Sequence, residues 1–203
     1  MIQSLKPKSK AVNYLTKNRF LSKQVMVKKA DIYEEELRKK EILEAALDCF
    51  LQFGYSKTSM DDIAKKAGLS RPLLYLKFKN KEDLFTAIFL YLMEGRYEAS
   101  EEVLKTKLNA KEKLIRISEI LLIEPWAKVA GHPMTSDYYE ACSRLSPKVM
   151  EKYERFVIKS VQSVLGDKET AEIFFLAMDG MSADLPSVKI LKRRMEILID
   201  KFV

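Results

Sequence analysis

SRPLLYLKFKNK, residues 70–81, is the stretch that decides how this chain folds. Ser70 is a residue type that caps helix N-termini, and Pro72 fits the first helical turn, where a missing N–H costs nothing. Leu74 and Phe78 are four residues apart, so they form one apolar stripe that should face the protein interior. The sequence therefore predicts a short helix here, with a second face left for a partner.

The opposite face of this predicted helix mixes aliphatic, aromatic and basic side chains: Pro72, Leu73 and Leu76, flanked by Arg71, Tyr75 and Lys77. Such a face suits the DNA major groove, because aliphatic groups can touch thymine methyls while Arg and Lys meet guanine edges or phosphates. A helix that is buried all round and capped by solvated lysines explains the same residues. The stretch by itself does not decide between these two interpretations.

The residues just before this stretch predict a second short helix. Thr58 and Ser59 can cap its N-terminus, and acidic residues follow in its first turn. The tetrapeptide at residues 67–70, Ala-Gly-Leu-Ser, joins this helix to the next one. Two short helices connected in this way, the second with an outward polar and aliphatic face, form a helix-turn-helix. This context favours the DNA-reading interpretation.

Length and composition predict an all-α protein. The chain has 203 residues, of which 47% are hydrophobic, with only six Gly and six Pro, which argues against disorder or a fibrous repeat. Its apolar residues recur mostly at intervals of three and four, as in helices, rather than at two. Since no apolar run approaches the roughly 20 residues that span a bilayer, we expect no membrane insertion.

The sequence offers little for catalysis or metal binding. It contains one histidine and two cysteines, Cys49 and Cys142, without metal-type spacing, and two unpaired thiols suit a reducing cytoplasm. We find no Gly-rich phosphate loop and no paired acid–base carboxylates in the sequence. We therefore expect a cytoplasmic protein that is not an enzyme, with no metal site and no cofactor.

The net charge of +7 is concentrated at the N-terminus. Residues 1–30 hold eight Lys or Arg and no Asp or Glu, so residues 31–203, with 28 basic and 29 acidic residues, sum to −1. A basic arm indicates a polyanionic partner, either nucleic acid or an anionic membrane face. A poorly ordered leader, upstream of an alternative start at Met26, explains the tract equally well. We assign residues 1–32 to a basic N-terminal extension.

Three consecutive segments carry a specific resemblance: ILEAALDCFLQFGY, TSMDDIAKKAGLS and LLYLKFKNKEDLF. Through them, residues 38–85 resemble, without a gap, the DNA-binding domain of the TetR family of bacterial transcriptional regulators. The resemblance implies a homodimer that reads an inverted repeat in double-stranded DNA and responds to a small-molecule effector. It also implies a three-helix helix-turn-helix domain at residues 33–82 and a larger helical effector-binding and dimerisation domain at residues 83–203.

The resemblance assigns DNA contacts residue by residue. It places Arg71, Pro72, Leu73 and Tyr75 at the DNA surface, beside the helix cap Ser70, and it places Thr58, Ser59, Lys77 and Lys81 on phosphates.

Two of these positions depart from the family. Lys77 stands where relatives usually have His or Tyr, and Leu73 stands where many have a small polar residue. A lysine meets a phosphate as a flexible point charge, and a leucine cannot hydrogen-bond a base, so readout should lean on methyl contacts and DNA shape. These departures keep an alternative open, a helical interaction protein of the same fold that has lost specific DNA binding.

Periodicity predicts the remaining helices. One runs from Glu34 to Phe53 and ends at Gly54, and its inward stripe is Ile42, Ala46, Cys49, Phe50 and Phe53. A long helix should run from Asn80 through Gly95, and the family resemblance implies that it joins the DNA-binding head to the C-terminal body. Further helices are expected at residues 111–123, where Pro125 follows as a break, and at residues 134–145, 146–165, 168–183 and 187–202.

The body offers candidates for an effector pocket and for a subunit interface. Its Pro-interrupted middle lies beside aromatic residues, where a cavity is easiest to build, although plain core packing also explains aromatic residues there. The candidate ligand-binding residues are Trp126, His132, Met134, Tyr138, Tyr139 and Phe156. The last two helices have apolar faces broad enough for a core and a partner, and in the family such a pair meets its twin in a four-helix bundle. The candidate interface residues are Phe174, Met178, Met181, Met195, Leu198 and Phe202.

Overall fold

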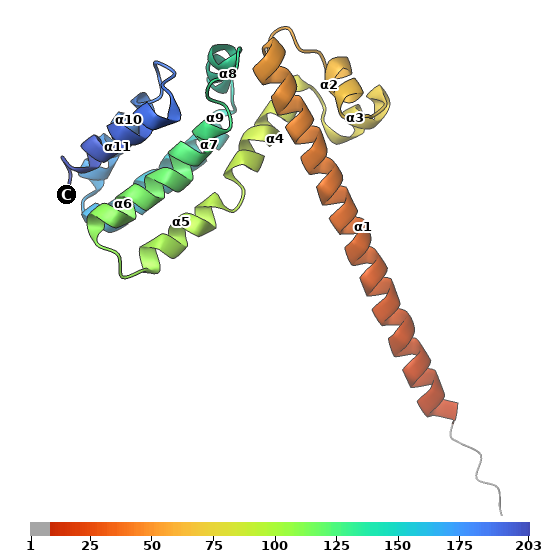
Figure 1. The fold of residues 1–203 in the computed structure, drawn as a ribbon. Helices are drawn as coiled ribbons and strands as arrows, with labels where there is room; N and C mark the ends of the chain where they lie inside the picture. The colour runs from red at the N-terminus through yellow and green to blue at the C-terminus, as the bar shows by residue number, and fades with distance from the viewer. Residues whose placement is uncertain (1–8) are drawn as a thin grey trace, which may run out of the picture. The chain divides into compact units, whose positions relative to one another are not determined.

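The computed structural model describes the backbone of residues 9–203 and the side chains of residues 28, 29 and 31–203. Within this part the chain is helical with no strand, so the all-α prediction is confirmed (Figure 1). The chain divides into two units, residues 1–41 and residues 42–203. The elements are α1 (Ser9–Phe53), α2 (Met60–Lys66), α3 (Arg71–Lys77), α4 (Lys81–Met93), α5 (Arg96–Lys105), α6 (Ala110–Ser118), the π-helix η1 (Glu119–Ile123), α7 (Glu124–Ala127), α8 (Thr135–Cys142), α9 (Pro147–Leu165), α10 (Lys168–Gly180) and α11 (Val188–Ile199).

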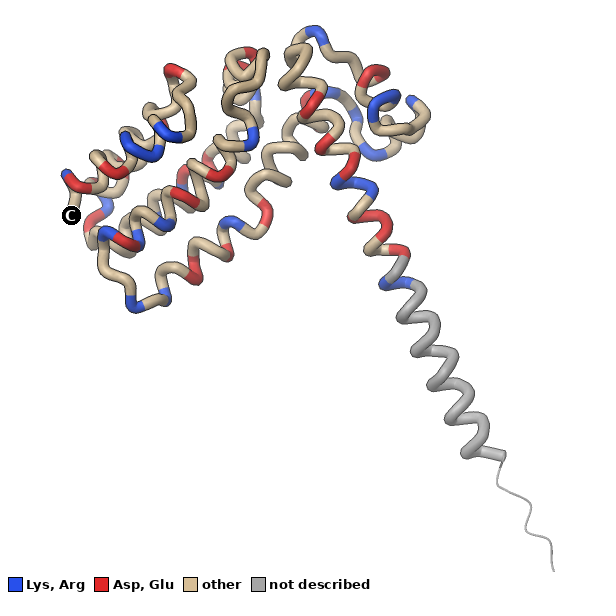
Figure 2. The backbone as a smooth tube through the Cα atoms, in the orientation of Figure 1, with Lys and Arg blue, Asp and Glu red and all other residues tan. Residues whose placement is uncertain are grey.

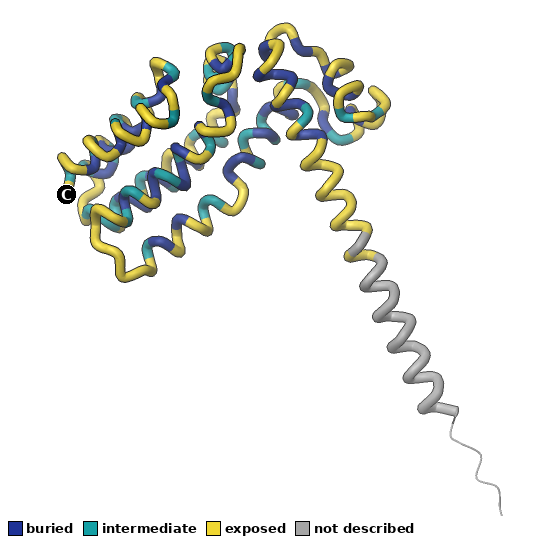
Figure 3. Tube along the Cα trace, in the orientation of Figure 1, coloured by how far each residue is buried: buried dark blue, intermediate teal, exposed yellow. Residues whose placement is uncertain are grey.

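Helix α1 begins at Ser9, so the predicted start at Glu34 is wrong. No Gly or Pro lies between Ser9 and Phe53, and nothing in that stretch stops a helix. In the first unit, the described side chains at residues 28, 29 and 31–41 are all exposed (Figure 3). The other side chains of the proposed basic extension, including Met26, lie outside the described residues.

The second unit opens with a three-helix head around a small core. The C-terminal part of α1 contributes Phe50, α2 contributes Ile63 and α3 contributes Leu74, each fully buried. As predicted, α1 ends before Gly54, whose φ of +91° is the left-handed backbone that glycine tolerates best. Phe53 departs from its predicted place on the core stripe, with 57% of its surface exposed, because it is the last residue of α1 and the chain turns away beside it.

In the body, α4 to α11, buried positions recur along the helices (Figure 3). Helix α9 packs against α5, α6 and α10, and α11 packs against α6 and η1. The inward residues of α9 follow the expected spacing of three and four, and the helix ends before Gly166, as predicted. Among the described residues, no helix combines the length and the apolar character that crossing a membrane requires.

The long helix predicted from Asn80 through Gly95 is a single helix, α4, but it is shorter than predicted. Helix α4 ends at Met93, and α5 starts at Arg96. Gly95 between them has a φ of +70°, and a left-handed residue cannot continue an α-helix. The predicted end is two residues too late because apolar periodicity continues across a glycine whose backbone conformation it does not report.

Pro125 does not break the helix before it, contrary to the prediction. The chain passes from α6 through the π-helical turn η1 into α7, with Pro125 in the first turn of α7. A π-helical turn bonds residue i to residue i+5, so it widens the helix just where a proline ring would otherwise crowd the carbonyl four residues earlier. The helix therefore continues to Ala127 instead of ending near Ile123.

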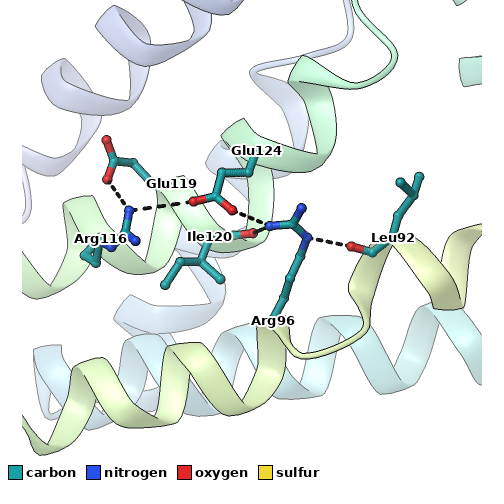
Figure 4. Close-up of polar contacts among 6 residues, drawn as sticks. All are labelled: Leu92, Arg96, Arg116, Glu119, Ile120 and Glu124. Carbon is teal, nitrogen blue, oxygen red and sulfur yellow. Dashed lines mark hydrogen bonds and ion pairs between the residues drawn. The ribbon is translucent and has the colours of Figure 1, made fainter. Parts of the chain in front are cut away.

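Arg96 joins the break between α4 and α5 to this π-helical turn (Figure 4). Its guanidinium donates to the carbonyls of Leu92 and, at 3.2 Å, Ile120, and it pairs with Glu124. Arg116 lies 3.6 Å from the same carboxylate. Because the Arg96 side chain is only 15% exposed, these charge-assisted bonds are less screened than a surface ion pair.

Replacing Arg96 with Met should lower the free energy of unfolding by about 2 kcal/mol, because two carbonyls and a carboxylate lose a charged donor. Urea denaturation followed by circular dichroism measures this. Lys105→Met is the matched control, since Lys105 is exposed and pairs with Glu102 three residues earlier in an exposed contact. It should leave stability unchanged, and equal losses in the two variants would contradict the proposed role of Arg96.

Candidate nucleic-acid interface

Ser59 and Asp62 fix the start of α2 through a reciprocal capping box. The Asp62 N–H donates to Ser59 Oγ at 3.2 Å, while the Asp62 carboxylate accepts the Ser59 N–H at 2.9 Å and its hydroxyl at 2.6 Å. The hydrogen bonds from the side chain and backbone of Ser59 lower the pKa of Asp62. The two otherwise unpaired donors at this helix end are thus satisfied, and α2 starts where the sequence predicted.

Helix α3 is held against the head by Leu74 and Phe78, which are 0% and 5% exposed. Ser70 occupies the N-cap with an extended backbone, and Pro72 lies in the first turn. Gly68 has a φ of +64°, which closes the turn between α2 and α3. The predicted apolar stripe and the predicted start of the helix are both confirmed.

The other face of α3 points into solvent. Leu73 is 41% exposed, Tyr75 40% and Leu76 82%. A helix buried all round would cover these three bulky side chains, so that alternative is excluded. The predicted outward face of apolar and aromatic groups is confirmed.

Arg71 lies at the edge of this face in a fixed orientation. Its Nε is 3.0 Å from one Asp61 oxygen, and its Nη1 donates to the other at 3.1 Å. The guanidinium also lies 5.5 Å from the centre of the Tyr75 ring. Exposed contacts of this kind stabilise a fold little, but together they restrict the side chain to the basic and aromatic edge of α3.

Thr58 has a structural role, so its predicted phosphate contact is wrong. The side chain is 3% exposed, and its hydroxyl donates to the carbonyl of Gly54 at 2.7 Å. Ser59, by contrast, is exposed, although its hydroxyl already donates to Asp62. The sequence pattern did not distinguish these neighbours, because both hydroxyls suit a helix N-terminus.

The Lys81 side chain, predicted to contact a DNA phosphate, also points into the protein. Its Nζ donates to the carbonyl of Tyr55 at 2.7 Å and to that of Thr58 at 3.0 Å. The same ammonium lies 4.5 Å from the centre of the Tyr55 ring. Two of its three N–H donors are therefore used to hold the loop between α1 and α2.

The body holds this loop from a second direction. The Tyr55 N–H donates to Asp137 of α8, and the Met134 N–H donates to the carbonyl of Leu51 at 3.1 Å. A Cβ on Gly54 would lie 2.9 Å from Met134 Cε and 3.1 Å from Asp137 Oδ2, and the φ of +91° at this position strains any residue other than glycine. The sequence analysis missed Tyr55 and Asp137, because they lie 82 residues apart and carry no shared local signal.

The predicted effector residues lie in separate places. Trp126 is buried and donates its indole N–H to the carbonyl of Pro186 at 2.9 Å, and Tyr139 packs edge-on against it. Tyr138 is buried against Phe85, with ring centres 5.2 Å apart. The aromatic members of the set thus have packing partners of their own.

The remaining three candidates do not join them. Phe156 packs against Tyr97 with ring centres 4.4 Å apart. His132 is exposed, and Met134 lies at the loop between α1 and α2. The contacts therefore do not gather the six residues around one cavity.

Half of the predicted subunit-interface residues are core residues of a single chain. Phe174, Met178 and Met195 are 0%, 1% and 3% exposed, so a partner cannot reach them and their assignment is corrected. Met181, Leu198 and Phe202 are partly buried. The outward apolar residues of the same two helices are Ile173 (54% exposed), Leu176 (69%), Ile190 (48%) and Ile197 (46%).

Known proteins share this arrangement. Residues 42–88 match the sequence profile described as "Bacterial regulatory proteins, tetR family". The chain is 33% identical over 134 residues to the HTH-type transcriptional regulator YhgD of Bacillus subtilis. The aligned residues are 64% of this chain and 68% of that protein. This chain belongs to the TetR family. It is thus a helix-turn-helix, DNA-binding protein of transcription regulation, as the sequence resemblance implied.

Another curated relative and two solved structures are also similar to this chain. The fatty acid metabolism regulator protein of Bacillus subtilis is 40% identical over 74 residues, which are 36% of this chain and 38% of that protein. A TetR-like regulator from Rhodococcus sp. RHA1 superposes with a TM-score of 0.58 at 25% identity, covering 81% of this chain and 94% of that one. A TetR regulator from Haloarcula marismortui gives a TM-score of 0.65 at 16% identity over 82% of this chain and 97% of that one, and shares the fold. The TetR fold therefore includes the helical body as well as the head.

Replacing Lys81 with Met should lower the free energy of unfolding by about 1–2 kcal/mol, because the carbonyls of Tyr55 and Thr58 lose a charged donor. Lys79→Met is the matched control, two residues away and exposed. Thermal melts of both variants measure the effect, and only the Lys81 variant should melt earlier. A Lys81 variant as stable as the control would show that the loop does not depend on this side chain.

Proposed function

We propose that this TetR-family chain is a repressor that binds an inverted-repeat operator in double-stranded DNA as a homodimer. A small-molecule effector bound in the body, residues 83–203, lowers its operator affinity, and residues 33–82 form the DNA-reading domain. The proposal includes no cofactor and places the protein in the cytoplasm, beside its DNA. The observation that supports it best is the exposed apolar and basic face of α3 on a firmly anchored head.

The chemistry of α3 supports direct contact with base edges. Leu73 and Leu76 extend from the helix into solvent at a spacing of three residues, which suits contact with successive thymine methyls. Arg71 has the planar, two-pronged donor geometry that matches the O6 and N7 acceptors of guanine. Tyr75 lies beside this guanidinium and supports its orientation.

Contacts with phosphates would set the register of α3 on the duplex. Basic residues follow α2, α3 and the adjoining loops, as the blue segments of the head show (Figure 2). Ser59 and Ser70 precede the two helices and expose polar groups at their N-termini, and Lys77 follows at the end of α3. Such contacts supply affinity without sequence preference and make binding depend on salt.

Replacing Arg71 with Met should reduce discrimination between the operator and a single-base variant about 10-fold or more, by roughly 1–3 kcal/mol for one lost bidentate contact. Lys77→Gln is the comparison, because loss of a phosphate contact should weaken all duplexes alike and reduce the salt slope by about one. Fluorescence anisotropy at several salt concentrations separates the two effects. If Arg71→Met keeps the full discrimination, this arginine does not read bases.

The exposed apolar residues of α10 and α11 support a subunit interface. Ile173 and Leu176 are three residues apart on α10, and Ile190 and Ile197 are seven apart on α11, so each pair lies on one side of its helix. Two such helices facing their copies form a four-helix bundle around a two-fold axis. In this arrangement the core residues Phe174 and Met178 support the interface from beneath.

Leu176→Glu should give a folded monomer that no longer binds the operator, because a carboxylate would be buried without a partner at the centre of the interface. Leu108→Glu is the matched control, since Leu108 is 41% exposed in the loop between α5 and α6. Sedimentation equilibrium measures the mass of each variant. A wild-type chain that sediments as a monomer would refute the dimer.

Selection of bound sequences from a random duplex pool tests the proposed function as a whole. It should return an inverted repeat whose half-site spacing reports the separation of the two α3 helices. A reporter gene placed behind that site should be silenced by the protein, and an activated reporter would refute repression. Equal binding to selected and random duplexes would instead favour the alternative, an interaction protein that has lost specific DNA recognition.

A further inference from the structure

A groove of about 860 Å³ lies beside the end of α1 and the start of α2. It is lined by Cys49 and Phe53 of α1, by Lys57 in the loop, by Lys65 and Lys66 of α2, and by Met134 just before α8. Its volume falls within the range of small-molecule sites in proteins. Gln52, Thr58 and Asp62 complete the lining, and the hydroxyl of Thr58 donates to the carbonyl of Gly54.

The groove has an apolar side. Phe53 exposes 57% of its surface, although an aromatic residue at the end of an amphipathic helix is normally covered. Met134 is partly buried and brings a thioether, and Cys49 is a buried thiol whose pKa is raised by desolvation. An aromatic ring and two sulfur atoms together suit a flat apolar ligand, because sulfur and aromatic groups pack favourably against rings.

The groove also has a positive side with one excess charge. Three lysines line it together with Asp62. Lys66 pairs at 3.2 Å with Asp48 outside the lining, whereas Lys57 and Lys65 have no ion-pair partner among the described residues. Asp62 accepts two hydrogen bonds from Ser59 and also interacts electrostatically with Lys65, so its one negative charge offsets one of the two positive charges. The net charge of Lys57, Lys65 and Asp62 is thus +1, which suits a ligand with one anionic group.

We propose that this groove binds a small amphipathic organic anion, an aromatic ring system that carries a single carboxylate or sulfonate. The ring packs against Phe53 and Met134, and the anionic group meets Lys57 and Lys65. An inorganic phosphate or a DNA phosphate would use the lysines but leave the exposed Phe53 ring without a role, so the apolar side favours an amphiphile.

Occupancy of the groove would regulate operator binding, a consequence that rests on the proposed function. An anion held by Lys57 and Lys65 removes positive charge from the head and thereby weakens its attraction for phosphates. The ligand would also contact Met134, whose N–H bonds to Leu51 of α1, so it would lie against both the head and the start of α8. Ligand binding and DNA binding are therefore opposed.

The test uses two dyes that share one ring system, the anion 1-anilinonaphthalene-8-sulfonate and the neutral N-phenyl-1-naphthylamine. Each is titrated by fluorescence into the full chain without DNA. Phe53→Ser should weaken both dyes about 10-fold, and Lys57→Gln/Lys65→Gln should weaken only the anion, by about 5-fold or more. The control Lys148→Gln/Lys159→Gln, with two exposed lysines of α9, should change neither titration. Phe53 and these lysines are exposed, so thermal melts should show that all variants fold.

Equal affinity of both dyes for the wild type, or an unchanged affinity in Phe53→Ser, would overturn the site. If the α9 control loses as much affinity for the anionic dye as Lys57→Gln/Lys65→Gln does, the loss reflects the net charge of the protein. That result would also overturn the site. Anisotropy of a labelled operator then tests regulation: the anionic dye should release the wild type and not Phe53→Ser. A protein that binds no duplex would refute the proposed function, while the titrations without DNA would still decide the site.

Discussion

Two side chains of opposite charge, one from α4 and one from α8, hold the loop between α1 and α2 in place. Lys81 of α4 donates to the carbonyls of Tyr55 and Thr58, and Asp137 of α8 accepts the N–H of Tyr55. One backbone segment is thereby tied to two helices of the body, α4 and α8. This loop sets the position of α2 and α3, because α2 starts directly after it.

An aromatic cluster packs around the same loop between α1 and α2. Tyr55 lies 5.2 Å from Phe50 and 5.1 Å from Phe85, measured between ring centres, and Phe85 lies 5.2 Å from Tyr138. The rings come from α1, the loop, α4 and α8, so the cores of head and body are continuous there. Close packing transmits displacement better than a flexible linker does, which gives a physical route between the body and α3. Gly54 lets the backbone come close enough for this contact.

A second set of contacts holds α4 and α5 against the rest of the body. Gly95 follows the end of α4, and Arg96 binds the carbonyls of Leu92 in α4 and Ile120 in η1 while pairing with Glu124 at the start of α7. The π-helical turn and the left-handed glycine are both departures from regular helix, and they lie on the two elements that Arg96 connects. Irregular turns of this kind are common at functional sites, and here they define where the helix from the head is fixed to the body.

The sequence by itself determined the helical fold, the helix-turn-helix and the outward face of α3, because these follow from local rules. Caps such as Ser59, stops such as Gly54 and Gly166, and the i, i+4 pair of Leu74 and Phe78 act within a few residues. The tertiary structure decided what covers each apolar face. Periodicity marks Phe53 and Phe174 alike as apolar helix residues, but burial depends on segments far away in the chain. Only the folded chain leaves Phe53 and Leu176 in solvent, encloses Phe174, and brings Asp137 to Tyr55.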